Sequence, residues 1–134
     1  YQVSSQKRDK VFKDVIIEQY HHKCAVTGVK YHLENLTEAQ AAHIISKSLK
    51  GSDDPRNGIA LSRTAHWAFD AGMFTISDQY EIIVNPKAKL ASSNKFPILD
   101  MDGKPIALPE DEAYSPHPEA LEWHKKEVFD KFMI

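Results

Sequence analysis

Residues 41–72 contain side chains that could perform catalysis together: His43, Asn57, His66 and Asp70. A histidine can act as a general base near neutral pH, because its unperturbed pKa is about 6.5. That role suits His43, whose ring could be held in one orientation by the amide carbonyl of Asn57. His66 and Asp70 are four residues apart, so on a helix they share a face and can offer a divalent cation one nitrogen and one oxygen.

A cation with so few protein ligands keeps positions open for water and for a phosphate. It would stabilise the negative charge that grows on a phosphodiester and on its leaving oxygen during hydrolysis. The four side chains together therefore indicate a metal-dependent phosphodiester hydrolase.

Each of the four residues also has an ordinary structural interpretation. His43 has apolar neighbours in the sequence, and such a histidine is more often a hydrogen-bonded structural residue in the core or at a sheet edge than a catalytic base. Asn57 begins an Asn-Gly turn signal, which is compatible with an orienting role. His66 could lie on a helix surface, and Asp70 could accept hydrogen bonds near the helix end or pair with Arg63. The coincidence of all four favours the catalytic interpretation.

Secondary-structure signals place these residues on a strand, a loop, a second strand and a helix. Residues 39–45 are small and apolar, and they predict a short buried strand, as do residues 59–61. The segment between them is rich in Gly, Ser, Asp and Pro, and it predicts an exposed loop. Ser62 is a candidate N-cap and Gly72 a candidate stop for a helix over about 63–71.

The elements outside this stretch must position it. They are a helix at 7–20, a loop at 29–38, a hairpin at 73–77 and 80–84, a proline-rich segment at 85–116 with a strand at 106–108, and a final helix at about 118–132. Trp67 and Phe69 are expected in the core, with Trp67 against the first helix. His21, His22 and His32 are expected on the surface and His124 in a structural role.

The motifs and their order resemble the HNH endonuclease family, the ββα-metal nucleases. CAVTG at 24–28, AAHI at 41–44, NGIAL at 57–61 and AHWAFDAG at 65–72 resemble the subgroup found as the C-terminal domain of restriction endonucleases. The resemblance implies an α+β fold with a ββα-metal core, flanking N- and C-terminal helices and an additional hairpin. We expect a single nuclease domain over 1–134, cut from a longer protein. Its core would span about 24–84, its N-terminal helix about 7–20, and its C-terminal extension and helix about 85–132.

The resemblance also implies roles for individual residues. His43 corresponds to the general base that activates water, Asn57 to the residue that constrains this base and its loop, and His66 to the metal ligand on the helix. Asp70 lies one turn on, where some relatives such as colicin nucleases present a second ligand. The implied reaction is hydrolysis of DNA to a 5′-phosphate and a 3′-hydroxyl. The implied cofactor is a divalent cation, Mg²⁺ first, with Mn²⁺, Ni²⁺ or Zn²⁺ as alternatives.

Two features depart from the family. Many members carry Asp or His just before the base as another metal ligand, but here that position is Ala42, which leaves the ligand set thin. Ala42 therefore favours the alternative of a nucleic-acid-binding module that has lost cleavage; an RNA-cutting toxin is a third interpretation. Cys24 is the only cysteine, so an internal disulfide and a zinc-binding cysteine pair are both excluded. A single cysteine fits a cytoplasmic protein.

The overall charge argues mildly against a nucleic-acid partner, because 17 basic and 19 acidic residues give a net of −2. The charge is uneven, however: residues 1–66 carry a net of +3 and residues 67–134 a net of −5. The cations around the predicted site are Lys47, Lys50, Arg56 and Arg63, and we expect them to contact phosphates.

The expected partner is therefore DNA, with a covalently linked N-terminal recognition domain outside this chain. A homodimer would supply two active sites for two strands. No apolar run approaches the roughly 20 residues that span a bilayer, so no membrane is expected.

Overall fold

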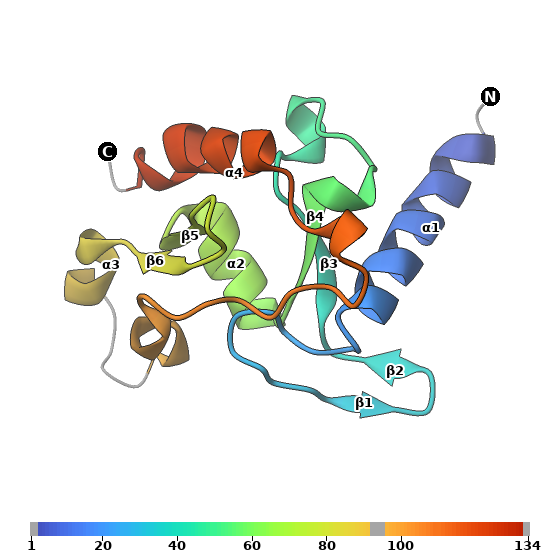
Figure 1. Ribbon diagram of the computed structural model, residues 1–134, viewed down its shortest axis with the longest axis horizontal. Helices are drawn as coiled ribbons and strands as arrows, with labels where there is room; N and C mark the ends of the chain where they lie inside the picture. The colour runs from blue at the N-terminus through green and yellow to red at the C-terminus, as the bar shows by residue number, and fades with distance from the viewer. Residues whose placement is uncertain (1–2, 92–95, 133–134) are drawn as a thin grey trace.

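Two antiparallel strands and one helix form the centre of the fold (Figure 1). In this computed structural model, which describes residues 3–91 and 96–132, β3 (Gln40–His43) pairs with β4 (Gly58–Leu61). The register places His43 opposite Gly58. The helix α2 (Arg63–Ala71) follows β4 directly. The predicted order of strand, loop, strand and helix is confirmed.

Both ends of α2 are fixed by the predicted caps. The Ser62 hydroxyl accepts a hydrogen bond from the Ala65 amide, which satisfies one free N–H of the first turn. Gly72 ends the helix in the left-handed region with φ 89°, a conformation that glycine adopts without strain. A Cβ atom at Gly72 would lie 2.6 Å from the carbonyl oxygen of Val128, so the glycine also lets the C-terminal segment approach α2.

The first helix, α1 (Val3–Gln19), packs across the two central strands. Phe12 and Ile16 are buried there, and the missing side chain of Gly58 gives them room, because a Cβ atom at Gly58 would lie 2.6 Å from the Phe12 ring. On the other side, α4 (Pro118–His124) packs near α2 and continues as a π-helical segment over Lys125–Phe129. The flanking N- and C-terminal helices are therefore both present.

The remaining elements confirm one prediction and correct another. The strands β5 (Phe74–Ile76) and β6 (Ile82–Val84) form the predicted hairpin, and the short helix α3 (Pro86–Ala91) follows. The strand predicted at 106–108 is wrong. This part of the chain forms an isolated bridge from Pro105 to Glu81, and the amides of Ile106 and Ala107 donate to the carbonyl oxygens of Tyr80 and Ala25. Residues 92–95 of the expected C-terminal extension lie outside the described residues.

The loop predicted at 29–38 is instead a second small hairpin. Its strands are β1 (His32–Leu33) and β2 (Leu36–Thr37), and it projects from the lower edge of the molecule in Figure 1. The turn between them consists of Glu34 and Asn35, and Glu34 adopts φ 55°. Sequence signals missed it because two-residue turns normally place Gly or Asn at such a position.

Trp67 also departs from expectation. Its side chain is 61% exposed, because α2 buries Ala65, Ala68 and Phe69 on the opposite face. Phe69 lies in the core as predicted. The architecture as a whole is the expected α+β class. Within the described ranges, no helix combines the length and apolar character needed to cross a membrane.

Candidate active site

His43, His66 and Asp70 line one pocket of about 310 Å³. His43 comes from the end of β3, while His66 and Asp70 come from the face of α2 that borders it. The C-terminal helix closes the pocket from the third side. The other lining residues are Ala41, Ile44, Ser46, Lys47, Trp123, His124 and Val128. The fold therefore brings together three of the four predicted chemical groups.

The His43 ring is held by two side chains that sequence reasoning missed. Its Nε2 atom lies 2.9 Å from Oδ1 of Asp53, and its face stacks on Phe12 with ring centroids 4.1 Å apart. Burial alone would raise the pKa of Asp53, but hydrogen bonds from Lys47 and His43 outweigh it and lower that pKa. An ionised carboxylate only accepts hydrogen bonds, so Nε2 carries the hydrogen and Nδ1 keeps its lone pair. In His43, Nε2 is therefore held by Asp53, and Nδ1 can accept a proton.

Asn57 does not contact this ring, so the expectation that its amide carbonyl holds His43 is wrong. Asn57 is buried and ties the two ends of the intervening loop together. Its Oδ1 accepts from the Ile45 amide at 2.8 Å, and its Nδ2 donates to the carbonyl oxygens of Ile45 at 3.1 Å and Ser52 at 2.8 Å. Asn57 thus fixes the loop that carries Asp53.

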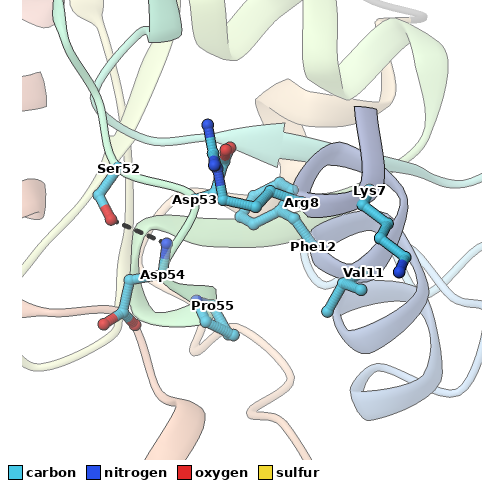
Figure 2. A pocket seen from close by; sticks show the side chains of 8 residues that line it. All are labelled: Lys7, Arg8, Val11, Phe12, Ser52, Asp53, Asp54 and Pro55. Carbon is cyan, nitrogen blue, oxygen red and sulfur yellow. Dashed lines mark hydrogen bonds between the residues drawn. The ribbon is translucent and has the colours of Figure 1, made fainter. Parts of the chain in front are cut away.

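Nothing in the sequence distinguishes Asp53 from its neighbour Asp54. The first turns toward His43, whereas the second accepts hydrogen bonds from Arg56. Asp53 and Phe12 also line a neighbouring groove of about 620 Å³ between α1 and residues 52–55 (Figure 2). The Asp54 amide donates to the Ser52 hydroxyl there, which shapes the loop. Loop geometry, rather than residue type, selects the partner of His43.

His66 is oriented toward Asp70 by Gln40, a residue of β3 that the sequence did not single out. Nδ1 of His66 lies 2.9 Å from Oε1 of Gln40, and an amide oxygen only accepts, so Nδ1 carries the hydrogen. Nε2 of His66 then presents a lone pair 3.3 Å from Oδ2 of Asp70. Two such acceptors at this separation attract only when a proton or a metal cation lies between them. The donor set therefore fits a divalent cation, and Gln40 fixes the ligand's tautomer as outer partners of metal sites do.

His66 and Asp70 are the two candidate metal ligands. Among the residues that the structure describes, no group of three or more His, Cys, Asp or Glu side chains is placed to hold a metal ion. A cation bound by His66 and Asp70 would therefore complete its coordination with water or substrate oxygen atoms.

The four predicted phosphate contacts differ in their surroundings. Lys47 pairs with Asp9 of α1 and, at 2.7 Å, with Asp53. Arg56 pairs with Asp54 at 2.9 Å. Lys50 and Arg63 are both exposed, Lys50 after the turn at Lys47–Leu49 and Arg63 at the start of α2.

His124 lines the pocket but has a structural environment. It stacks on Phe69 at 3.7 Å, its Nε2 donates to the Phe69 carbonyl at 2.8 Å, and its Nδ1 accepts from the Thr75 hydroxyl at 2.8 Å. Burial lowers the pKa of His124 to about 4. The neutral ring thus joins α4 to α2 and β5.

His22 and His32 lie outside the pocket and stack on each other at 4.0 Å.

Comparisons with known proteins agree with this fold. One solved structure, described as a modification dependent TagI restriction endonuclease, is similar in fold with a TM-score of 0.67 and 17% sequence identity. The similarity covers 88% of this chain and 37% of that protein, so this chain spans little more than a third of its length. A comparison with curated protein sequences found no match. Residues 24–77 match the HNH endonuclease family model, which spans β3, β4 and α2. The segment that carries the sequence motifs is therefore similar to the HNH endonuclease family, as those motifs indicated.

Proposed function

We propose that this chain is a metal-dependent DNA endonuclease domain that hydrolyses phosphodiester bonds. The observation that carries the proposal is that one pocket is lined by His43, whose Nε2 bonds to Asp53, and by His66 and Asp70, which could offer a cation two ligand atoms. The match of residues 24–77 to the HNH family supports the reaction class.

His43 would act as the general base. Nδ1 would take a proton from a water molecule, and the resulting hydroxide would attack phosphorus as the bond to the 3′-oxygen breaks. The released 3′-oxygen would take a proton from solvent, which leaves a 5′-phosphate and a 3′-hydroxyl. Asp53 accepts the hydrogen bond from Nε2 throughout, so it holds the ring and stabilises the imidazolium that forms. Phe12 keeps the ring plane fixed by stacking.

His66 and Asp70 would hold the divalent cation, with Mg²⁺ the first candidate and Mn²⁺, Ni²⁺ or Zn²⁺ as alternatives. Such a cation supplies charge stabilisation to a phosphodiester and its leaving oxygen. Gln40 keeps Nε2 of His66 available as the ligand atom. Both ligand atoms would come from one helix, α2, and the remaining coordination positions would be left to water and substrate.

The substrate would be DNA in the cytoplasm, bound by the exposed Lys50 and Arg63, while Lys47 and Arg56 also hold the loop between β3 and β4. The similar restriction endonuclease is much longer than this chain. That difference supports a linked recognition domain outside this sequence, which would supply specificity for sequence or base modification. Two copies would cut both strands.

A second candidate is a nucleic-acid-binding module that keeps the fold without cleavage. Ala42 favours it, because the residue removes one expected metal ligand. A third candidate, an RNA-cutting enzyme on the same core, differs only in substrate.

A plasmid-nicking assay separates these candidates. The purified domain is incubated with supercoiled DNA and Mg²⁺, Mn²⁺ or Ni²⁺, with and without EDTA, beside a labelled RNA. Cleavage of DNA that EDTA abolishes and that His43→Ala lacks supports the proposal. Equal behaviour of the wild type and His43→Ala with every metal refutes it, DNA binding without cleavage supports the second candidate, and cleavage of RNA alone supports the third.

A further inference from the structure

The hairpin of β1 and β2 exposes its apolar face and turns its polar face to the molecule. Cross-strand partners lie on the same side of a hairpin, so the pair Leu33–Leu36 lies on one face and the pair His32–Thr37 on the other. Tyr31, two residues before Leu33, continues the leucine face. Tyr31, Leu33 and Leu36 are 69%, 71% and 69% exposed. Apolar side chains that serve the hydrophobic core are buried, so this exposed apolar face points to a binding surface.

The polar face anchors the hairpin to the end of α1. The Thr37 hydroxyl lies 2.6 Å from Nδ1 of His32 and 3.2 Å from Nδ1 of His22, and the two imidazole rings stack at 4.0 Å. At its base, the Glu38 carboxylate accepts a hydrogen bond from the Arg63 amide, which joins the hairpin to the start of α2. The apolar face is therefore held in place rather than left on a loose loop.

Cations flank this apolar face, and it leads toward the candidate active site. Lys30 and Arg63 line an open groove of about 560 Å³ together with the hairpin. Arg63 lies three residues before His66 and four before the exposed Trp67 on α2, so it neighbours both on the helix surface. A strip of apolar, aromatic and basic side chains thus runs from the hairpin tip to the cation-binding pair.

We propose that this hairpin strip, made of Tyr31, Leu33, Leu36, Arg63 and Trp67, contacts duplex DNA beside the cleaved phosphodiester. The inference rests on the proposed nuclease function. Apolar side chains that press against base steps while nearby Lys and Arg contact phosphates are a recurrent way of gripping and bending a duplex. The hairpin would therefore contribute affinity and position the strand, without taking part in the chemistry.

Two observations favour DNA over a protein partner. Lys30 and Arg63 in the groove are complementary to phosphate, and the one acidic lining residue, Glu38, accepts a hydrogen bond from the Arg63 amide. Any occupant of the strip would also lie next to His66, where the substrate must bind.

The test compares Leu33→Ser/Leu36→Ser with Leu90→Ser, a matched control because Leu90 is 90% exposed on α3, in a different element. Binding of a fluorescein-labelled 20-base-pair duplex is followed by anisotropy at low salt in EDTA, which prevents metal-dependent cleavage. We expect at least about tenfold weaker binding for the double variant and less than twofold for the control. Circular dichroism and thermal unfolding of each variant check that the fold is intact.

Equal affinity of the double variant and the wild type would overturn the hairpin proposal. If the wild type cuts plasmid DNA while both variants bind and cut equally well, the hairpin proposal alone fails. If the wild type neither binds nor cuts DNA, the proposed function fails with it. A wild-type dimer in sedimentation velocity that Leu33→Ser/Leu36→Ser converts to a monomer, with DNA affinity unchanged, would assign the surface to a second copy instead.

Discussion

His124 makes the stability of this domain depend on pH in a defined window. Burial lowers its pKa from 6.5 to about 4 in the folded state, so the unfolded chain binds the proton more tightly. The unfolded state therefore carries more protons between these two values, and stability must rise with pH across them. The contribution of the neutral His124 ring to the free energy of unfolding is fully present above pH 6.5 and is lost as the pH falls toward 4.

The magnitude follows from the two pKa values. Integrating the proton linkage for a single group with these values gives a loss of about 2 kcal/mol between pH 7 and pH 5. The full difference corresponds to roughly 3 kcal/mol, at about 1.4 kcal/mol for each pH unit. Asp53 and Asp54, whose pKa values are lowered, lose their stabilising effect mainly below this window, because the ordinary pKa of an aspartate is 3.8.

The assay is urea unfolding of the wild type and His124→Gln at pH 7, 6 and 5. Glutamine cannot titrate in this range, so the variant starts less stable at pH 7 and its free energy of unfolding changes less with pH. We expect the wild type to lose about 2 kcal/mol more than the variant between pH 7 and pH 5. His21→Gln serves as an exposed control and should follow the wild type. If the free energy of unfolding changes with pH by the same amount in the wild type and in His124→Gln, the assignment of a buried neutral imidazole is refuted.

Three further outcomes test the site. Asp53→Asn should lower the single-turnover rate of DNA cleavage at least about tenfold with little change in duplex affinity, whereas Asp54→Asn should not, because only Asp53 contacts His43. Asn57→Ala removes three hydrogen bonds of a buried amide and should cost about 2–4 kcal/mol in urea unfolding; an unchanged midpoint would contradict its role in the loop. His66→Ala should abolish Mn²⁺ binding measured by electron paramagnetic resonance, while His21→Ala should leave it intact.

The central ββα unit could be predicted from the sequence because its signals are local. Ser62 is a typical N-cap residue and Gly72 a typical C-terminal stop, so the two ends of α2 can be recognised from residue type. The short apolar runs around His43 and Ile59 predict the two strands, which pair in the structure. The expectation that Trp67 lies in the core is wrong, because it rests on the apolar character of the side chain and not on which face of α2 the residue occupies. The hairpin at β1 and β2 was missed because a left-handed Glu34 is a rare turn residue.

The groups that complete the site could not be predicted, because they depend on how distant segments meet. Asp53 and Asp54 are identical residue types in adjacent positions, and only the loop held by Asn57 decides which one reaches His43. Phe12 reaches the ring only because Gly58 gives α1 room to approach β4. Gln40 matters only because β3 lies beside α2. Residue types predicted the candidate reactive groups, whereas tertiary packing determined which side chains hold them.

The most direct measurement of the central claim is single-turnover cleavage of an end-labelled duplex in Mg²⁺ by the wild type and His43→Ala, with duplex affinity measured in parallel. A general base at Nδ1 of His43 predicts that the variant loses at least about 100-fold in rate, keeps its affinity within about twofold, and produces 5′-phosphate ends only at the residual rate. Cleavage by His43→Ala at the wild-type rate, with EDTA still abolishing it, would contradict the account.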